Sequence, residues 1–247
     1  MNVENLFPRW RLALHHNSEG STPSGKNGRP VNIQTTPYEF QPIDLEKWAR
    51  REHFQFFSTF SEPFFSICAE VKCGGLVARS KQQGRSATFG FWHGVLRAAN
   101  AVEEFRTRIV DGRPVVFERT HLSPTVLRPD KTFGIGFVPF LDDYEMFATQ
   151  AAKSVEEVRA STGFQLSEES RRVDLIHFST VPWFRFMGLT HARPLRQGES
   201  EPKITLGKFG PGPDGKLLIP VSITAHHGMV DGYHVALFLE ELEKLWA

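Results

Sequence analysis

The chain has 247 residues, of which 40% are hydrophobic, and its formal net charge is +1. This length suits one large domain or two small ones, with enough apolar side chains for a sizeable core. The near-neutral charge argues against a nucleic-acid partner. No stretch is long and apolar enough to span a membrane, and the N-terminus lacks the pattern of a signal peptide. We therefore expect a cytoplasmic protein in which Cys68 and Cys73 are free thiols.

The first forty residues differ from the rest of the chain. Residues 17–30 are polar and rich in Gly, Ser and Pro, and such a run cannot bury enough apolar surface to order itself. We predict that residues 1–40 form a partly flexible N-terminal extension and that residues 41–247 form one catalytic domain.

Apolar residues at helical spacing predict four helices. Asp44 offers an N-cap for the first of them. The predicted helices cover residues 45–57, 88–106, 142–161 and the C-terminal stripe from Val235 to Trp246.

Strands fill the segments between these helices. They are predicted at residues 64–71, 109–110, 115–117, 125–127, 173–179, 203–209 and 216–224. The dipeptides Asp111-Gly112 and Asp214-Gly215 predict hairpin turns. Strands and helices do not alternate strictly, so we expect an α+β fold, a two-layer sandwich of a mixed β-sheet packed with helices.

The most informative segment lies near the C-terminus. The apolar run over residues 217–224 ends at His226 and His227, and Asp231 and Gly232 follow. A histidine at the end of a strand, before a tight turn, is well suited to accept a proton near neutral pH. Asp231 can buttress the turn.

Four motifs in chain order extend this observation. They are Trp48-Ala49-Arg50-Arg51-Glu52-His53-Phe54, Ser179-Thr180-Val181-Pro182-Trp183, Thr205-Leu206-Gly207-Lys208-Phe209 and the segment from Leu217 to His234. Together they resemble the chloramphenicol acetyltransferase family, acetyl-CoA-dependent acyltransferases with a His-His-x-x-x-Asp-Gly signature. The resemblance covers most of residues 41–247.

The resemblance implies roles for five catalytic-site residues. His227, the second histidine of the pair, corresponds to the general base. Ser179 corresponds to the hydroxyl that stabilises the oxyanion, and Thr205 to a hydroxyl that holds a water in the same site. Asp231 corresponds to a structural carboxylate that pairs with Arg50 of the first helix.

The resemblance also implies two binding regions. Trp183, Lys208 and Phe209 fall at positions that bind coenzyme A, and Phe56 and Phe57 fall in the acceptor pocket. The well-known members of the family have tyrosine at the positions of Phe57 and Phe209, so two hydroxyl groups are missing here. The segment over residues 113–125 follows the family only loosely.

The function implied is transfer of an acetyl group from acetyl-CoA to a hydroxyl of chloramphenicol, which inactivates this antibiotic. A thioester is reactive enough for direct attack in a ternary complex, with a histidine base and no metal. The family also implies a homotrimer, in which His227 comes from one subunit and most of the acceptor pocket from its neighbour.

Four alternatives arise at this point. An acyltransferase of the same fold could act on another small alcohol or amine in secondary metabolism. The core of a dihydrolipoyl acyltransferase has a related motif but would carry lipoyl domains, and a condensation domain would need about twice the length. A non-catalytic antibiotic-binding protein would have no use for an aligned His227, Ser179 and Asp231.

Overall fold

A computed structural model describes residues 39–247, with the exception of residues 165–166 and 194–197. Nearly all of the predicted extension, residues 1–40, thus lies outside the described residues. The strands are β1 (Phe40–Pro42), β2 (Phe64–Lys72), β3 (Thr107–Val110), β4 (Arg113–Phe117), β5 (His121–Leu127), β6 (Phe133–Ile135), β7 (Leu175–Thr180), β8 (Lys203–Leu206), β9 (Gly210–Pro211) and β10 (Leu217–His226). The helices are α1 (Arg51–Phe57), α2 (Gly74–Gln82), α3 (Ala87–Ala101), α4 (Glu103–Arg106), α5 (Tyr144–Ala160) and α6 (Gly232–Trp246), with a 3₁₀ turn at Glu169–Arg171.

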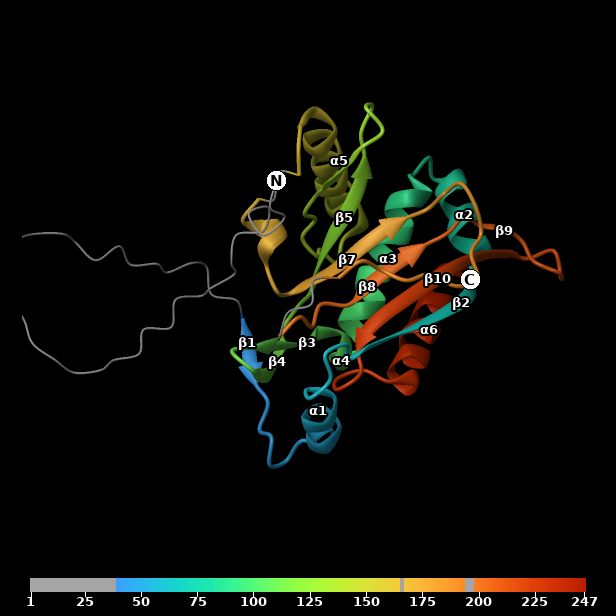
Figure 1. The fold of residues 1–247 in the computed structure, drawn as a ribbon. Coiled ribbons are helices and arrows are strands. Elements are labelled where there is room, and N and C mark those ends of the chain that lie inside the picture. The colour runs from blue at the N-terminus through green and yellow to red at the C-terminus, as the bar shows by residue number, and fades with distance from the viewer. Residues whose placement is uncertain (1–38, 165–166, 194–197) are drawn as a thin grey trace, which may run out of the picture. The chain divides into compact units, whose positions relative to one another are not determined.

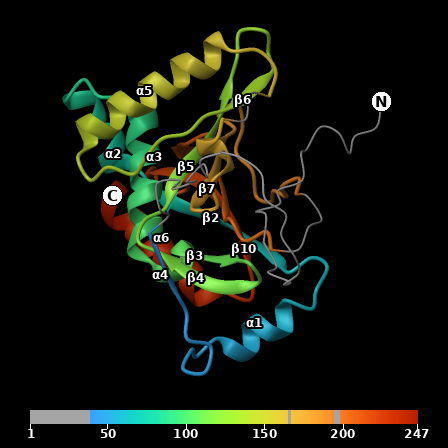
Figure 2. The same cartoon turned by 90° about the vertical axis from the view of Figure 1, so that its left-hand side faces the viewer.

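Seven strands form the main sheet, in the order β2-β10-β8-β7-β5-β6, with β9 paired to β10 (Figure 1). Strands β5, β7 and β8 pair in parallel, and the other pairs are antiparallel. A separate three-stranded sheet has the order β1-β4-β3. The large helices lie on one side of the main sheet (Figure 2). This arrangement confirms the predicted mixed sheet and two-layer α+β fold.

The two faces of the main sheet differ in chemistry because side chains alternate along each strand. One face carries the hydrophobic core, into which residues such as Ile176, Ile204 and Ile223 project. The register places hydroxyl, thiol and imidazole side chains on the other face: Ser66, Cys68, Ser123, Thr125, His177, Ser179, Thr205, Ser222, Thr224 and His226. The helices bury the first face, and the functional residues predicted on strands belong to the second.

Helices α3 and α6 form the centre of the helical layer. Val95, Leu96 and Phe238 are fully buried, and the predicted stripe from Val235 to Trp246 falls within α6. Helix α3 is shorter than predicted because buried Val102 adopts an extended conformation, with φ −111° and ψ 114°, and separates α3 from α4.

The first predicted helix is wrong in its N-terminal half. The Asp44 carboxylate accepts a hydrogen bond from the Glu46 amide at 3.1 Å, as a cap would, but the turn does not continue and α1 begins only at Arg51. Leu45 and Trp48 pack against the core from this turn. Tertiary contacts therefore override the local helix signal, and Arg50 precedes the helix instead of lying within it.

Other predicted boundaries hold or shift, and the largest shift is at β5, which begins at His121 instead of Thr125. Both hairpin turns are confirmed, since Asp111, Gly112 and Gly215 have positive φ angles and lie between paired strands. The predicted strand 203–209 ends early, at Leu206. The Gly207 amide still donates to the Pro220 carbonyl of β10 at 2.9 Å, but the Lys208 amide donates to the Phe184 carbonyl instead, at 3.0 Å.

The sequence pattern does not predict β1, α2, β6 and β9, which are short or lack strong periodicity. Cys68 and Cys73 are free thiols, as predicted. No helix within residues 39–247, outside the two gaps, has the length and hydropathy needed to cross a membrane.

Candidate active site

The imidazole of His227 lies just beyond the C-terminal end of β10. The His227 amide donates to the Pro63 carbonyl at 2.7 Å, and the side-chain Nδ1 lies 3.2 Å from the Val230 carbonyl oxygen. A carbonyl only accepts hydrogen bonds, so Nδ1 carries the hydrogen in the neutral ring. The lone pair is then on Nε2, which is the nitrogen able to accept a proton.

His226 occupies a different environment although it is the adjacent residue. Its side chain is 3% exposed, and its Nδ1 accepts a hydrogen bond from the Gly228 amide at 3.1 Å. Burial, and then the positive charge of Arg193, lower the pKa of His226 to about 4. His226 is therefore a neutral structural residue, which agrees with the assignment of the second histidine as the candidate base.

Arg50 ties the turn after β10 to the segment before α1. Its guanidinium donates to the His227 carbonyl at 3.1 Å and pairs with the Asp231 carboxylate at 2.5 Å. The same carboxylate accepts from the Tyr233 amide at 3.0 Å and caps α6. The predicted Arg50–Asp231 pair thus exists, and it holds the backbone on both sides of the histidine turn.

The pair is partly buried, with side-chain exposures of 11% for Arg50 and 31% for Asp231. Burial raises the pKa of Asp231, but the Arg50 hydrogen bond and the charges of His234 and Arg50 outweigh it, and the net shift is downward. Because the folded pKa is lowered, ionised Asp231 stabilises the fold above its ordinary pKa. That stabilisation is lost as the pH falls through the folded pKa.

Asp231→Asn is expected to lower the free energy of unfolding by about 2 kcal/mol, between the values typical of surface and of buried pairs. Asparagine retains an oxygen that can cap α6 but leaves the Arg50 charge without its partner. Urea unfolding at pH 7 measures the loss. Glu145→Gln is the matched control because Glu145 also pairs with an arginine at 2.5 Å, yet is 63% exposed. A loss no larger than the control's would contradict the proposed clamp.

Aromatic rings surround the candidate base. The Phe57 ring stacks on the His227 imidazole, with centroids 4.3 Å apart and an interplanar angle of 15°, and the Phe65 ring lies 4.5 Å away. Phe56 contacts both Phe57 and Phe60, and is 58% exposed. The predicted acceptor residues Phe56 and Phe57 therefore lie beside His227, on an exposed aromatic surface.

Ser179 and Thr205 lie side by side on the polar face of the sheet. They are paired in register on the parallel strands β7 and β8. The Ser179 hydroxyl lies 2.9 Å from the Thr125 hydroxyl. The Thr205 hydroxyl lies 2.8 Å from Nε2 of His191. The two predicted oxyanion-site hydroxyls thus form one polar cluster with Thr125 and His191.

A cavity of about 350 Å³ lies at the same end of the sheet. It is lined mainly by the N-terminal half of α3, by the ends of β7 and β8 and by the residues that follow these two strands, including Lys208 and Phe209. Pro182 lines the cavity, whereas Trp183 is 62% exposed beside it in sequence. Apolar walls with one lysine suit a long chain that ends in phosphates.

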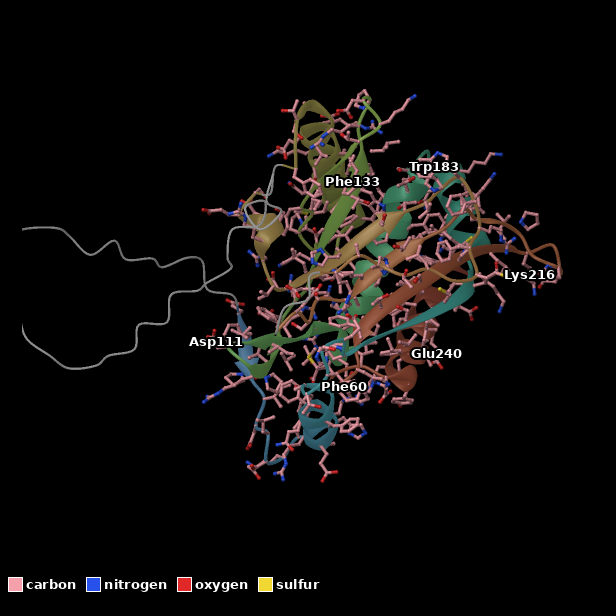
Figure 3. The ribbon with its side chains drawn as sticks, in the orientation of Figure 1. Phe60, Asp111, Phe133, Trp183, Lys216 and Glu240 are labelled. Carbon is pink, nitrogen blue, oxygen red and sulfur yellow. The ribbon has the colours of Figure 1, made fainter. Side chains whose placement is uncertain are left out.

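The candidate base and the hydroxyl cluster lie far apart within one chain. Ser222 is in register with Thr205, which is in register with Ser179. His227 follows Ser222 by five residues, a separation of about 17 Å at the rise of an antiparallel strand. Figure 3 shows Phe60 of the aromatic surface and Trp183, which follows β7, on different parts of the molecule. A base and an oxyanion donor that far apart cannot act on one reacting group.

Four residues of these clusters are not predicted as site residues from the sequence: Phe60, Phe65, Thr125 and His191. The chain has 22 phenylalanines, so Phe60 and Phe65 do not stand out among them. Thr125 is predicted only as part of a strand. His191 lies outside all four motifs, so a local pattern offered no signal for it.

The chain is similar to known proteins of one family. The profile of the chloramphenicol acetyltransferase family matches residues 38–243. A chloramphenicol acetyltransferase of Streptomyces acrimycini is 30% identical over 210 residues, which are 83% of this chain and 94% of that protein. One of Campylobacter coli is 28% identical over 211 residues, 84% of this chain and 98% of its own.

Solved structures agree with the sequence matches. A chloramphenicol acetyltransferase structure superposes with a TM-score of 0.78 at 31% identity, and covers 85% of this chain and 100% of that one. A dihydrolipoamide acetyltransferase of Azotobacter vinelandii has a TM-score of 0.59 at 15% identity, over 79% of this chain and 86% of that one. At that identity the second match shows a shared fold only.

The fold and the matched profile define the chain as an acetyl-CoA-dependent acyltransferase. More narrowly, it belongs to the chloramphenicol acetyltransferase family and is an O-acetyltransferase of that type. The roles of individual residues stay predictions. So does the absence of a metal, although no metal-binding group of three or more His, Cys, Asp or Glu is found in the described ranges.

Proposed function

We propose that this enzyme transfers the acetyl group of acetyl-CoA to a hydroxyl of chloramphenicol, with His227 as general base. The hydroxyl oxygen attacks the thioester carbonyl carbon while Nε2 of His227 takes the hydroxyl proton. The C–S bond then breaks, and the imidazolium returns the proton to the coenzyme A thiolate. The products are the acetyl ester and free coenzyme A, and no covalent enzyme intermediate is needed.

One observation carries the proposal: the hydrogen bond between Nδ1 of His227 and the Val230 carbonyl. It fixes the tautomer in which Nε2 has the lone pair, as a general base requires. The stacked Phe57 ring and the Arg50 contact to the His227 carbonyl hold the imidazole in place. Preorganisation of this kind lowers the cost of reaching the reactive geometry.

The hydroxyl cluster supports stabilisation of the negative charge that develops on the thioester oxygen. Ser179 is a hydroxyl donor at the end of β7, and its contact with Thr125 restricts its orientation. Thr205 lies beside it and is 1% exposed. In a site of low dielectric constant, each preorganised donor contributes on the order of 3 kcal/mol to transition-state stabilisation.

The separation of about 17 Å along β10 supports an active site between two copies of the chain. His227 of one copy would meet Ser179 and the cavity of the next, and a closed ring satisfies every such contact. We therefore propose a homotrimer, the state that the family resemblance implies. In this assembly each site combines the aromatic surface of one subunit with the hydroxyl cluster of another.

The cavity beside α3 supports a binding site for acetyl-CoA. Phe91 and Trp92 supply apolar walls for the pantetheine chain, and Lys208 is exposed near its rim, where it can contact phosphate. Gly207 also lines the cavity, and the Phe186 ring and Pro220 pack where its side chain would lie. Acetyl-CoA as the donor fits a cytoplasmic enzyme, which we also propose.

The aromatic surface around Phe57 supports a small acceptor with an apolar ring. The names of the relatives favour chloramphenicol. A second candidate is another small alcohol, since Phe57 lacks the hydroxyl of the tyrosine found at this position in well-known members of the family. The reaction and its catalytic groups are the same for both candidates.

The test is release of coenzyme A thiol, followed with a chromogenic thiol reagent, with chloramphenicol and a panel of small primary and secondary alcohols. We expect release that depends on chloramphenicol, with the acetyl ester detected by mass spectrometry. Release with other alcohols but none with chloramphenicol would favour the second candidate. Tight binding of chloramphenicol with no release for any acceptor would contradict transferase activity.

A further inference from the structure

His191 joins three strands of the polar face through a chain of hydrogen bonds. Its Nε2 lies 2.8 Å from the Thr205 hydroxyl of β8, and its Nδ1 lies 3.0 Å from the Thr224 hydroxyl of β10. Thr224 in turn lies 2.7 Å from the Ser66 hydroxyl of β2. His191 comes from the segment between β7 and β8. Both ring nitrogens are thus engaged by hydroxyl groups, and one of these belongs to the candidate oxyanion site.

The surroundings of His191 keep its ring neutral. Burial, and then the positive charges of Lys203 and Arg193, lower the pKa of His191 to about 4. A neutral imidazole has one nitrogen that donates and one that accepts a hydrogen bond. The tautomer of the ring therefore sets the donor-to-acceptor order of the hydrogen bonds from Ser66 to Thr205. This order decides where the hydrogen of the Thr205 hydroxyl points.

Of the two possible directions, only one leaves Thr205 able to donate. If Nε2 carries the hydrogen, it donates to the Thr205 oxygen, and the Thr205 hydrogen is left for another acceptor. If Nδ1 carries the hydrogen, Thr205 donates to the ring and presents only lone pairs elsewhere. A developing oxyanion needs donors, and aligned hydroxyl and imidazole donors polarise one another.

We propose that His191 is a positioning residue that orients the Thr205 hydroxyl as a donor for the oxyanion site, in the tautomer with hydrogen on Nε2. This inference rests on the proposed transferase function. His191 does not exchange protons with a substrate. It acts through Thr205, which donates to the oxyanion or to a water bound there, and it links this hydroxyl to Thr224 and Ser66 of the neighbouring strands.

The kinetic test uses His191→Leu, His191→Gln and Thr205→Val in the full chain. Leucine fills space but offers no hydrogen bond, so kcat should fall roughly 10-fold to 100-fold, below the loss typical of a direct oxyanion donor. Glutamine can donate and accept at a similar spacing, so it should restore kcat to within roughly 3-fold of wild type. The KM values for both substrates should stay within 2-fold, roughly, because His191 does not bind them.

A double-mutant cycle separates positioning from a general packing role. If His191 acts through Thr205, the double variant His191→Leu, Thr205→Val should have the kcat of Thr205→Val alone, within roughly 2-fold. Met187→Ala is the matched control, since Met187 lies in the same segment and is 98% exposed. Multiplied losses in the double variant, no rescue by glutamine, or a selective rise in the acceptor KM would each overturn the proposal.

A second measurement does not depend on activity. In protein labelled with ¹⁵N-histidine, the His191 ring should show a neutral tautomer with hydrogen on Nε2 between pH 6 and pH 8, and Thr205→Val should shift its Nε2 signal. A hydrogen on Nδ1, or an Nε2 signal that does not change in the Thr205→Val variant, would overturn the inference. Wild-type protein that turns over no acceptor would instead contradict the proposed function, while the spectrum still tests the contact between His191 and Thr205.

Discussion

Replacing His227 by alanine is expected to lower kcat by about 10³-fold to 10⁴-fold at pH 7.5, the usual contribution of a positioned acid–base group. The hydroxyl of an alcohol cannot attack as an alkoxide at this pH, so the proton must leave as the new bond forms. Without an imidazole, water must accept it from an unfavourable position. The measurement is coenzyme A thiol release at saturating acetyl-CoA.

Two further variants show whether the fall in kcat comes from the loss of the base. His227→Gln keeps a donor for the Val230 carbonyl but has no basic nitrogen, so it should be as inactive as the alanine variant. His53→Ala removes an exposed histidine of α1, and its kcat should stay within about 2-fold of wild type, as expected for a surface substitution. A glutamine variant with near-normal kcat would mean that His227 holds the turn and does not take the proton.

Two inactive variants are expected to restore activity when they assemble together. His227→Ala lacks the base, and Ser179→Ala lacks the oxyanion donor, which is worth about 10²-fold to 10³-fold in kcat. If each site combines His227 of one copy with Ser179 of the next, a mixed trimer contains one fully wild-type site. About one third of the wild-type activity per trimer should return, as the closed ring geometry requires.

The experiment uses coexpression with two different affinity tags and isolation of the mixed assemblies. The matched control pairs the His227→Ala chain with a chain that carries both substitutions, because this pair offers no His227 at all. Mixed assemblies no more active than each variant alone would contradict a shared site. That result would require His227 and Ser179 of one chain to move together over a strand length, which the paired register of β7, β8 and β10 opposes.

The alternation of the central strands explains why this fold suits the proposed chemistry. Ile204 and Ile223 fix β8 and β10 onto the helical layer, while Thr205 and Thr224, one position along each strand, project to the opposite face. The core thus sets the spacing of the polar groups without contacting the substrates. A rigid strand positions a donor more accurately than a loop does.

Periodicity and turn chemistry made much of this fold predictable. The predicted strands at residues 64–71 and 216–224, the Asp-Gly turns and the stripe of α6 rest on local signals, and the structure confirms each of them. The family resemblance located His227, and the Arg50–Asp231 pair that it implied is present at 2.5 Å.

Other features depend on contacts between residues distant in the sequence. The cap signal at Asp44 predicted a helix start, but the packing of Trp48 and the reach of Arg50 to residues 227–231 end that first turn. His191 has no motif of its own. Its two hydrogen bonds exist only because β8 and β10 pair. The pairing brings the Thr205 and Thr224 hydroxyls close enough for the two nitrogens of one imidazole ring to reach both.

The chain's local pattern therefore determined most of its elements and its α+β class, and the resemblance of its motifs pointed to the candidate base, because periodicity, turn residues and motif spacing are properties of neighbours along the sequence. Only the tertiary structure decided which nitrogen of His227 is free, which hydroxyls meet His191, and that Ser179 lies level with Ser222, five residues before His227. These three features depend on strand register and on contacts between residues distant in the sequence, and no short segment of the sequence contains that information.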